Sequence, residues 1–326
     1  MSDDLDSVLR QAARLYYMHG LDQAKVASLV GVSRSQVSRL LARAREKGIV
    51  RIWVDEYDPR NSALEAELKR VFGLNHAIVV RTVNGASSET VRRATGYFAA
   101  PVVSELIRSN TVLGVAGGRT LYEMVQHMAP TAGTQGVAVV QLMGNIGPSV
   151  SNTDAIELSH TLARNFKGTF YTLNAPAYAP DRETRDVFLR HQDVRSVYEL
   201  FDMMQIALVG IGSLTESSFI YQGVLGPSGI QQLRARGAMG EICGRFFDSQ
   251  GRDCATEYQE RVISVELDVL RHAPEVIGVV GGEGKAEAVY AACKSRLIKS
   301  LVIDEAGAKS VLAKAAEGVT ADVGRG

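Results

Sequence analysis

From Ala77 onward, short apolar segments alternate with amphipathic ones. The apolar segments lack the polar positions that a half-exposed strand would show, so both of their faces must be buried. Apolar strands separated by helical segments predict an α/β fold with a parallel sheet covered on both faces, because parallel strands require crossover connections. We predict strands at residues 77–80, 112–116, 136–143, 169–173, 206–211, 276–280 and 301–303.

The segments between these strands place apolar residues at helical spacing. Helices are predicted at residues 89–107, 120–128, 154–166 and 285–292, from Glu305 onward, and at 182–201 in one or two pieces. Between Ser228 and Asp268 the alternation breaks, and Gly244–Gly251 predicts a hairpin or an inserted loop. The result is a Rossmann-like sheet with one irregular insertion.

A different pattern precedes the sheet, between Gly20 and Val54. Asp22 is placed to cap one helix and Ser33 to cap a second, and Gly31 lies at the turn between them. The apolar residues expected to face inward are Val26, Leu29, Val30, Val37, Leu40, Leu41 and Ala44. An upstream helix through Val8, Ala12 and Leu15 would complete a three-helix core, so the region predicts a helix-turn-helix.

The outer face of the second predicted helix carries only hydrogen-bonding and cationic groups. Arginine recognises guanine, glutamine recognises adenine, and serine and arginine also contact phosphates, so this face predicts a DNA major-groove surface. The alternative is an ordinary charged helix surface, and an acidic protein partner is a weaker alternative. The predicted DNA-binding residues are Ser33, Arg34, Ser35, Gln36, Ser38, Arg39 and Arg43.

The segment after this helix predicts a domain boundary. Ile49–Val54 is rich in β-forming residues and predicts the wing strand of a winged helix-turn-helix, and the polar stretch Asp55–Asn61 predicts a linker. We therefore expect a DNA-binding domain at residues 1–56 and an effector domain at residues 57–326. Ser62 is expected to cap a helix ending at Phe72, whose narrow apolar stripe suits either a dimer seam or packing onto the effector domain.

Composition narrows the functional classes. The chain has 326 residues, a net charge of +0 and 46% hydrophobic residues, so its positive charge is local to the N-terminal region. The three cysteines and six histidines lack metal-site spacing, and we expect reduced cysteines, no metal and no cofactor. No signal peptide or membrane span is expected, which predicts a cytoplasmic protein.

Glycine-rich loops follow several of the predicted strands. Because ligands bind beyond the carboxyl ends of parallel strands, these loops predict one binding site at the sheet edge. Glycine after a strand is more often simple turn chemistry, so the prediction depends on several loops converging. The candidates include Gly117, Gly118, Arg119 and Thr120, which suit an anion, together with Gly144, Asn145 and Lys285. Asp248 is a candidate for sugar hydroxyls, and a turn cap is an equal alternative.

With these features together, the chain resembles the SorC family (SorC/DeoR-type) of sugar-responsive bacterial transcriptional regulators. The matching segments are LYYMHGLDQAKVASLVGVSRSQVSRLLARAREKGIVRI, GVAGGRTL, QLMGNIG, TDAIEL, NAPAY, ALVGIGSL, GEICGRFFDSQG and VIGVVGGEGKAEAV with LVIDEAGAKSVL. The resemblance implies an effector domain with the fold of sugar-phosphate isomerases and deaminases. It also implies a sugar or sugar-phosphate effector, a homodimer or homotetramer, and binding to operator DNA.

Carried over by position, the resemblance implies that Gly117, Gly118, Arg119 and Thr120 line the anion end of the effector. Asp248 and Lys285 would contact the effector, with Gly144 and Asn145 nearby. The expected function is a non-enzymatic regulator of a carbohydrate-catabolism operon. The main alternative is a sugar-phosphate isomerase or deaminase that carries a DNA-binding module, in which Asp248 and Lys285 would serve as base and acid.

Overall fold

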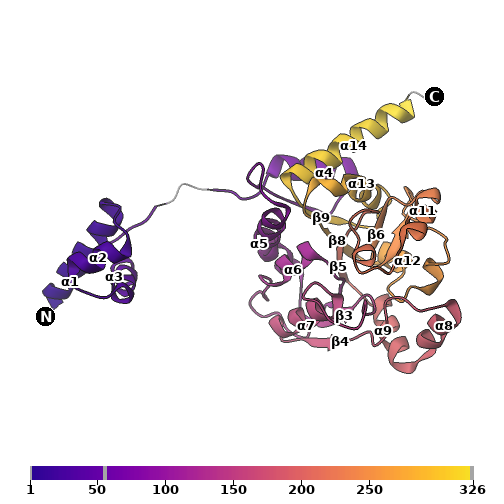
Figure 1. Ribbon diagram of the computed structural model, residues 1–326, viewed down its shortest axis with the longest axis horizontal. Helices are drawn as coiled ribbons and strands as arrows, with labels where there is room; N and C mark the ends of the chain where they lie inside the picture. The colour runs from indigo at the N-terminus through magenta and orange to yellow at the C-terminus, as the bar shows by residue number, and fades with distance from the viewer. Residues whose placement is uncertain (1, 54–56, 324–326) are drawn as a thin grey trace. The chain divides into compact units, whose positions relative to one another are not determined.

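The computed structural model describes residues 2–53 and 57–323. Its contacts divide the chain into two units, Met1–Asp58 and Pro59–Gly326, each with its own hydrophobic core. Figure 1 shows the helices of the first unit and the mixed helices and strands of the second. Among the described residues, no helix combines the length and the apolar character that crossing a bilayer demands.

Three helical segments form the first unit: α1 (Ser2–Ala13), continued by the π-helical turn Arg14–Met18, α2 (Gln23–Val30) and α3 (Arg34–Glu46). The predicted caps are confirmed, since Asp22 accepts a hydrogen bond from the Lys25 amide and Gly31 adopts φ 74° at the end of α2. The core contains Leu9, Ala12, Val26, Val37, Leu41 and Ala44. The inward assignment of Leu29 is wrong, because this side chain is 59% exposed.

The predicted wing strand at Ile49–Val54 is wrong for residues 49–53, and its last residue lies outside the described part of the chain. Ile49 and Val50 instead pack against the three-helix core, and the Val50 amide donates to Ala44 O at 3.1 Å. A strand needs a paired neighbour, and residues 2–53 contain none. High β-propensity alone therefore did not produce a strand here.

The second unit is built around a seven-stranded parallel sheet of order β1-β9-β8-β5-β2-β3-β4. This result confirms the predicted α/β class. The strands are β1 (His76–Val80), β2 (Val112–Val115), β3 (Ala138–Gln141), β4 (Thr169–Tyr171), β5 (Ile206–Gly210), β8 (Glu275–Val279) and β9 (Ser300–Asp304).

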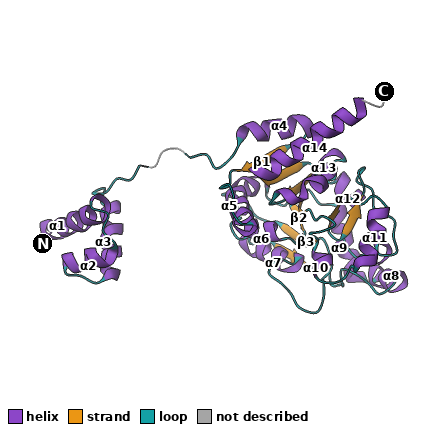
Figure 2. Ribbon diagram, turned by 45° about the horizontal axis from the view of Figure 1, so that its top comes forward, coloured by secondary structure: helices purple, strands orange, loops and turns teal. Residues whose placement is uncertain are grey.

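Both faces of the sheet are covered, as Figure 2 shows. On β1, Ile78 and Val80 belong to one core and Ala77 and Val79 to the other, which explains why residues 77–80 are all apolar. Helices α5 (Ser88–Leu106), α6 (Arg119–Val125) and α7 (Ala155–Asn165) contribute to the first of these cores. The second core includes α4 (Ser62–Phe72), α9 (Gln192–Asp202), α12 (Leu267–His272), α13 (Ala286–Lys294) and α14 (Glu305–Val323).

Helix α4 packs onto the second unit, which is one of the two roles expected for its apolar stripe. Leu68 is fully buried in the core of the second unit, and Leu64 and Phe72 pack against that core. The stripe therefore packs onto the core of the second unit, although Val71 remains 38% exposed. The cap is Asn61, whose Oδ1 accepts from the Leu64 amide at 3.2 Å, and not the predicted Ser62.

The region where the alternation breaks contains a short hairpin of β6 (Gly240–Ile242) and β7 (Arg245–Phe247). Its turn falls at Cys243–Gly244, earlier than the predicted position, because both residues adopt positive φ there. The remaining helices are α8 (Arg182–Arg190), α10 (Ser218–Tyr221) and α11 (Pro227–Ala235), with single 3-10 turns at Gln259–Arg261 and Glu283–Lys285.

Candidate functional site

Helix α3 presents the predicted DNA-binding face. All seven predicted residues are exposed, while Val37, Leu41 and Ala44 on the opposite side are buried. Ser33 Oγ accepts from the Gln36 amide at 3.3 Å, and Gln36 Oε1 accepts from the Ser33 amide at 2.8 Å. This capping box occupies the amide oxygen that Gln36 would need for bidentate recognition of adenine. The arginines of this face take no part in the capping box.

The order of the strands places a pocket at the carboxyl ends of the central strands. After β2 the chain proceeds to β3 and β4 on one side, and β5 is followed by β8 and β9 on the other. The neighbours β2 and β5 therefore mark a topological switch point, where ligands bind in open α/β sheets. A pocket lies there, lined by residues from the loops after β2, β3, β5 and β8.

Six of the eight predicted effector residues line this pocket: Gly117, Gly118, Arg119, Thr120, Gly144 and Lys285. Gly117 and Gly118 connect β2 to α6 where the chain approaches another loop closely. A Cβ on Gly117 would lie 2.9 Å from Thr153 O, and Gly118 has φ 153°. Close packing therefore requires glycine at position 117, and the backbone conformation favours glycine at position 118.

Asp248 is outside this pocket, so the structure does not join it to the other predicted effector residues. Its Oδ1 accepts from the amides of Gln250 and Arg252 at 2.8 and 3.0 Å, and its Oδ2 pairs with the Arg252 guanidinium at 2.9 Å. These bonds hold the pKa of Asp248 below its usual value despite the opposing effect of burial. These contacts are those of a residue that caps a turn, which was the alternative prediction for Asp248.

Asn145 also does not line the pocket. Its Oδ1 accepts from Gln141 Nε2 at 3.0 Å, and its backbone amide donates to Ala175 O at 2.9 Å. These contacts join the loop after β3 to the segment after β4. Asn145 therefore positions Gly144, which does line the pocket, and has no contact surface there itself.

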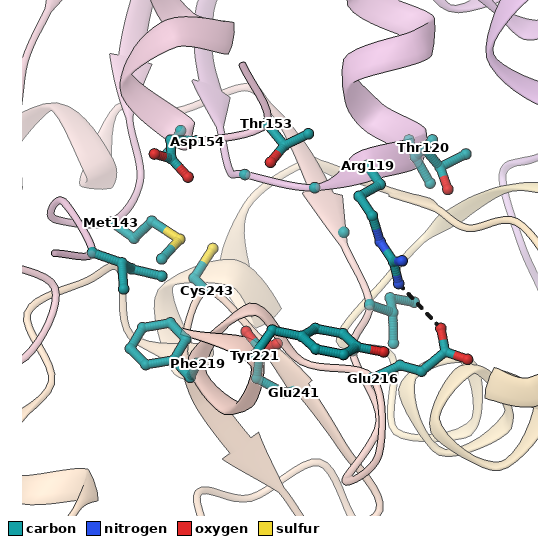
Figure 3. A pocket seen from close by; sticks show the side chains of 18 of the residues that line it. Arg119, Thr120, Met143, Thr153, Asp154, Glu216, Phe219, Tyr221, Glu241 and Cys243 are labelled. Carbon is teal, nitrogen blue, oxygen red and sulfur yellow. Dashed lines mark hydrogen bonds and ion pairs between the residues drawn. The ribbon is translucent and has the colours of Figure 1, made fainter. Parts of the chain in front are cut away.

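Several pocket residues were missed by the sequence analysis, including Arg92, Glu216, Phe219, Tyr221, Glu241 and Cys243. In Figure 3, Arg119 and Thr120 lie on one side, while Glu216, Phe219, Tyr221 and Glu241 lie across from them. An acidic residue within the apolar segment GEICGRFF was a usable signal for Glu241. Arg92 offered no such signal, because charged residues are ordinary on an amphipathic helix.

Three cations converge on the pocket from different elements: Arg92 from α5, Arg119 from α6 and Lys285 from the loop after β8. Burial lowers the pKa of Lys285, with a further lowering by Arg119, while Glu216 and Glu241 oppose the shift. Burial likewise lowers the pKa of Arg92. Desolvated cations of this kind are suited to binding an anion.

Glu241 is the buried carboxyl of the pocket. Its Oε1 accepts a hydrogen bond from the Gly244 amide, and burial raises its pKa while this bond, Ser217 and Lys285 oppose the shift. A carboxyl in this position can exchange hydrogen bonds with ligand hydroxyl groups. Cations and a carboxyl that line the same pocket together favour a ligand with both an anionic group and hydroxyls.

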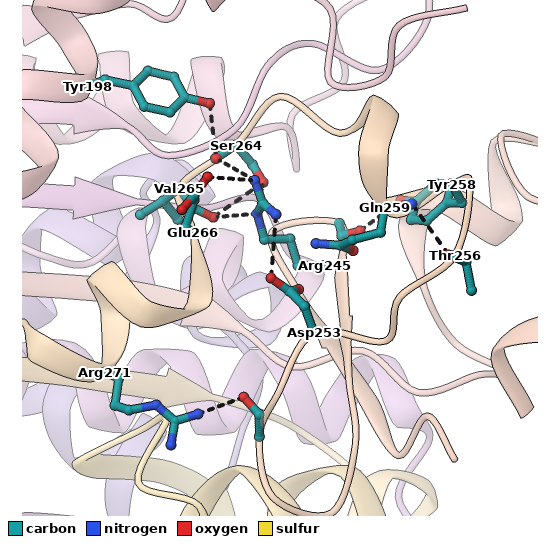
Figure 4. A network of polar contacts seen from close by, with 12 residues as sticks. Tyr198, Arg245, Asp253, Thr256, Tyr258, Gln259, Ser264, Val265, Glu266 and Arg271 are labelled. Carbon is teal, nitrogen blue, oxygen red and sulfur yellow. Dashed lines mark hydrogen bonds and ion pairs between the residues drawn. The ribbon is translucent and has the colours of Figure 1, made fainter. Parts of the chain in front are cut away.

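A buried polar network holds the β6–β7 hairpin that carries Glu241 (Figure 4). Arg245 Nε donates to Val265 O at 2.9 Å and to Ser264 Oγ at 3.2 Å. Arg245 Nη1 lies 3.5 Å from Asp253 Oδ2, and the Tyr198 hydroxyl donates to Ser264 O at 3.1 Å. Because Arg245 is buried together with Ser264 and Val265, these hydrogen bonds fix the hairpin against the residue 264–266 segment.

The network predicts a pH dependence of stability. Burial raises the pKa of Asp253 to about 6, with Arg245 opposing and Glu266 adding to the shift. Between about pH 4, the ordinary value for aspartate, and about pH 6, the folded chain therefore binds more protons here, so the free energy of unfolding falls as pH rises. We expect Asp253→Asn to remove this contribution, which solvent screening limits to about 2 kcal/mol or less.

Urea unfolding at several pH values between 4 and 7 tests this expectation. The matched control is Asp202→Asn, which changes an exposed aspartate of the same unit. An identical pH dependence for the wild type and Asp253→Asn would contradict the assignment.

The two units together define a class of protein: a transcriptional regulator with a helix-turn-helix and a ligand-binding α/β domain. A family model described as "Putative sugar-binding domain" (Sugar-bind) matches residues 59–313. The sorbitol operon regulator of Klebsiella pneumoniae is 30% identical over 315 residues, covering 95% of this chain and 99% of that protein. The chain belongs to the SorC family of sugar-binding transcriptional regulators.

Other comparisons agree with this membership. The deoxyribonucleoside regulator of Bacillus subtilis (strain 168) is 30% identical over 302 residues, covering 93% of this chain and 96% of that protein. The crystal structure of full-length SorC from Klebsiella pneumoniae has a TM-score of 0.74 at 30% identity, covering 93% of this chain and 97% of that one. These relatives are named as regulators and not as enzymes.

Proposed function

We propose that this chain binds operator DNA through α3 and that a sugar phosphate in the pocket between β2 and β5 controls this binding. The regulated genes would be those of a carbohydrate-catabolism operon. The names of the relatives support this assignment, since they refer to a sorbitol operon and to deoxyribonucleosides. A regulator of this kind acts on chromosomal DNA, and the proposal therefore places it in the cytoplasm.

The observation that carries the proposal is the convergence of Arg92, Arg119 and Lys285 on one cavity at the switch point. A phosphate group would satisfy these cations, and the hydroxyls of the sugar would be left to face Glu241. A neutral sugar would leave the cations without a ligand group. We therefore favour a phosphorylated effector over an unphosphorylated one.

Binding without catalysis is part of the proposal. The alternative hypothesis of an isomerase or deaminase requires Asp248 and Lys285 to act as base and acid at one site. Asp248, however, is held in a turn outside the pocket. Effector binding would act by changing the arrangement of subunits in a homodimer or homotetramer, because paired helix-turn-helix units need a half-site spacing of about one DNA turn. Such coupling typically corresponds to about 1–3 kcal/mol.

The test begins with a thermal-shift screen of the full chain against sugars, polyols and their phosphates. A DNA duplex is selected from a random library for binding to the full chain, and its affinity is then measured by fluorescence anisotropy with and without the screened compound. We expect a sugar phosphate to raise the unfolding temperature and to change the DNA affinity roughly 5–150-fold. Sequence-independent DNA binding, or turnover of the sugar phosphate, would contradict the proposal.

A further inference from the structure

Glu216 is the carboxylate that faces the cations of the pocket. Its Oε2 lies 3.2 Å from Arg119 Nη2 (Figure 3). Its Oε1 lies next to Gly284, the residue before Lys285, at 3.6 Å from the position that a Cβ on this glycine would occupy. Its charge also opposes the lowering that burial imposes on the pKa of Lys285 and of Arg92. Glu216 thus pairs directly with Arg119, and its charge also acts on Lys285 and Arg92.

The Arg119–Glu216 ion pair is weak enough for a ligand phosphate to replace the Glu216 carboxylate. The side chains of Arg119 and Glu216 are 44% and 41% exposed, and the contact is a single hydrogen bond in place of a bidentate one. Solvent-accessible pairs of this type are weak. A phosphate offers Arg119 more acceptor oxygens and a larger negative charge than a carboxylate does.

The peptide around Glu216 is coupled to Arg119 at a second point. The Glu216 amide donates to Ser213 Oγ at 3.1 Å, which fixes the turn after β5. Five residues further along, the Tyr221 ring lies under the Arg119 guanidinium, 5.5 Å from centroid to Cζ. Movement of Arg119 toward a ligand would therefore release the segment 213–221 at two contacts.

We propose that Glu216 competes with the anionic group of the effector for Arg119, so that a bound phosphate and the Arg119–Glu216 pair exclude each other. This inference rests on the proposed function and adds a regulatory element to the same site. A neutral sugar cannot displace Glu216 from Arg119, so the competition selects against unphosphorylated sugars. Release of segment 213–221 is then the first structural consequence of effector binding.

The test measures binding of inorganic phosphate, glucose 6-phosphate and glucose to the full chain by isothermal titration calorimetry. Glu216→Gln keeps the shape of the side chain and removes its charge. We expect this variant to bind phosphate and glucose 6-phosphate about tenfold more tightly than the wild type, without a gain for glucose. Glu216→Asp, which keeps the charge, should not show this gain.

Glu89→Gln is the matched control, because Glu89 also acts on Arg92 through its charge but pairs with Arg93 on the exposed side of α5. Its phosphate affinity should stay within about twofold of the wild type, consistent with a screened surface charge. Equal or weaker phosphate binding by Glu216→Gln overturns the inference, as does an equal gain for glucose or no phosphate binding by either protein. Failure of the proposed function would appear separately, in the DNA experiment, which does not use these variants.

Discussion

Replacing Lys285 with alanine is expected to lower the affinity for the proposed sugar-phosphate effector on the order of 100-fold and to abolish the effect of this sugar on DNA binding. The ammonium group lies at the pocket wall formed by the loop after β8, and its pKa is lowered chiefly by burial. A charge-assisted hydrogen bond from such a group contributes about 1.5–3 kcal/mol. Calorimetry measures the affinity, and fluorescence anisotropy measures the response.

The control for this variant is Lys294→Ala, which removes an exposed lysine from the end of α13. This change should leave effector affinity and DNA binding unchanged. An effector response that persists in Lys285→Ala would move the anion site away from the switch point. Loss of DNA binding without any sugar would indicate a folding defect, which circular dichroism can verify.

Replacing Arg39 with alanine is expected to weaken binding to the selected DNA duplex roughly 10- to 100-fold and to leave sugar-phosphate binding unchanged. Arg39 is exposed on α3, opposite the buried residues Val37 and Leu41. A base-contacting arginine contributes about 1–3 kcal/mol. A gel-shift titration at fixed salt gives the affinity of both proteins.

Arg236→Ala is the matched control, since it removes an exposed arginine from the second unit. Salt dependence then separates two roles for Arg39. Loss of a phosphate contact lowers the salt slope by about one, whereas loss of a base contact relaxes sequence preference at one position. Unchanged DNA affinity in Arg39→Ala would count against α3 as the recognition helix.

The comparison of Asp248 with Glu241 shows where sequence reasoning failed. Both are acidic residues near the Cys243–Gly244 turn, and the glycine-flanked position of Asp248 favoured it as a ligand contact. The register of the hairpin decides otherwise, because it pairs Glu241 with Phe246 and leaves Asp248 after the end of β7. Register depends on the position of the turn, which the positive φ values at Cys243 and Gly244 set.

The caps of α2 and α3 and the apolar strands were predictable because their causes are local. Ser33 caps α3 by accepting a hydrogen bond from the amide of Gln36, three residues away. The strands around Val79 and Val209 consist of apolar residues, and this composition alone predicts burial on both faces. The failure of the wing at Ile49–Trp53 has the opposite cause. A strand exists only with a partner, and no segment of the described first unit supplies one.

The amino-acid sequence by itself determined the α/β class, most element boundaries and the exposed cationic face of α3, since each depends on neighbours within a few residues. Only the tertiary structure decided that β2 and β5 are adjacent, and hence that Arg119 meets Glu216 from a loop 97 positions away. The physical reason is that strand order follows from how the helices cover both faces of the whole sheet, and no local pattern encodes that arrangement.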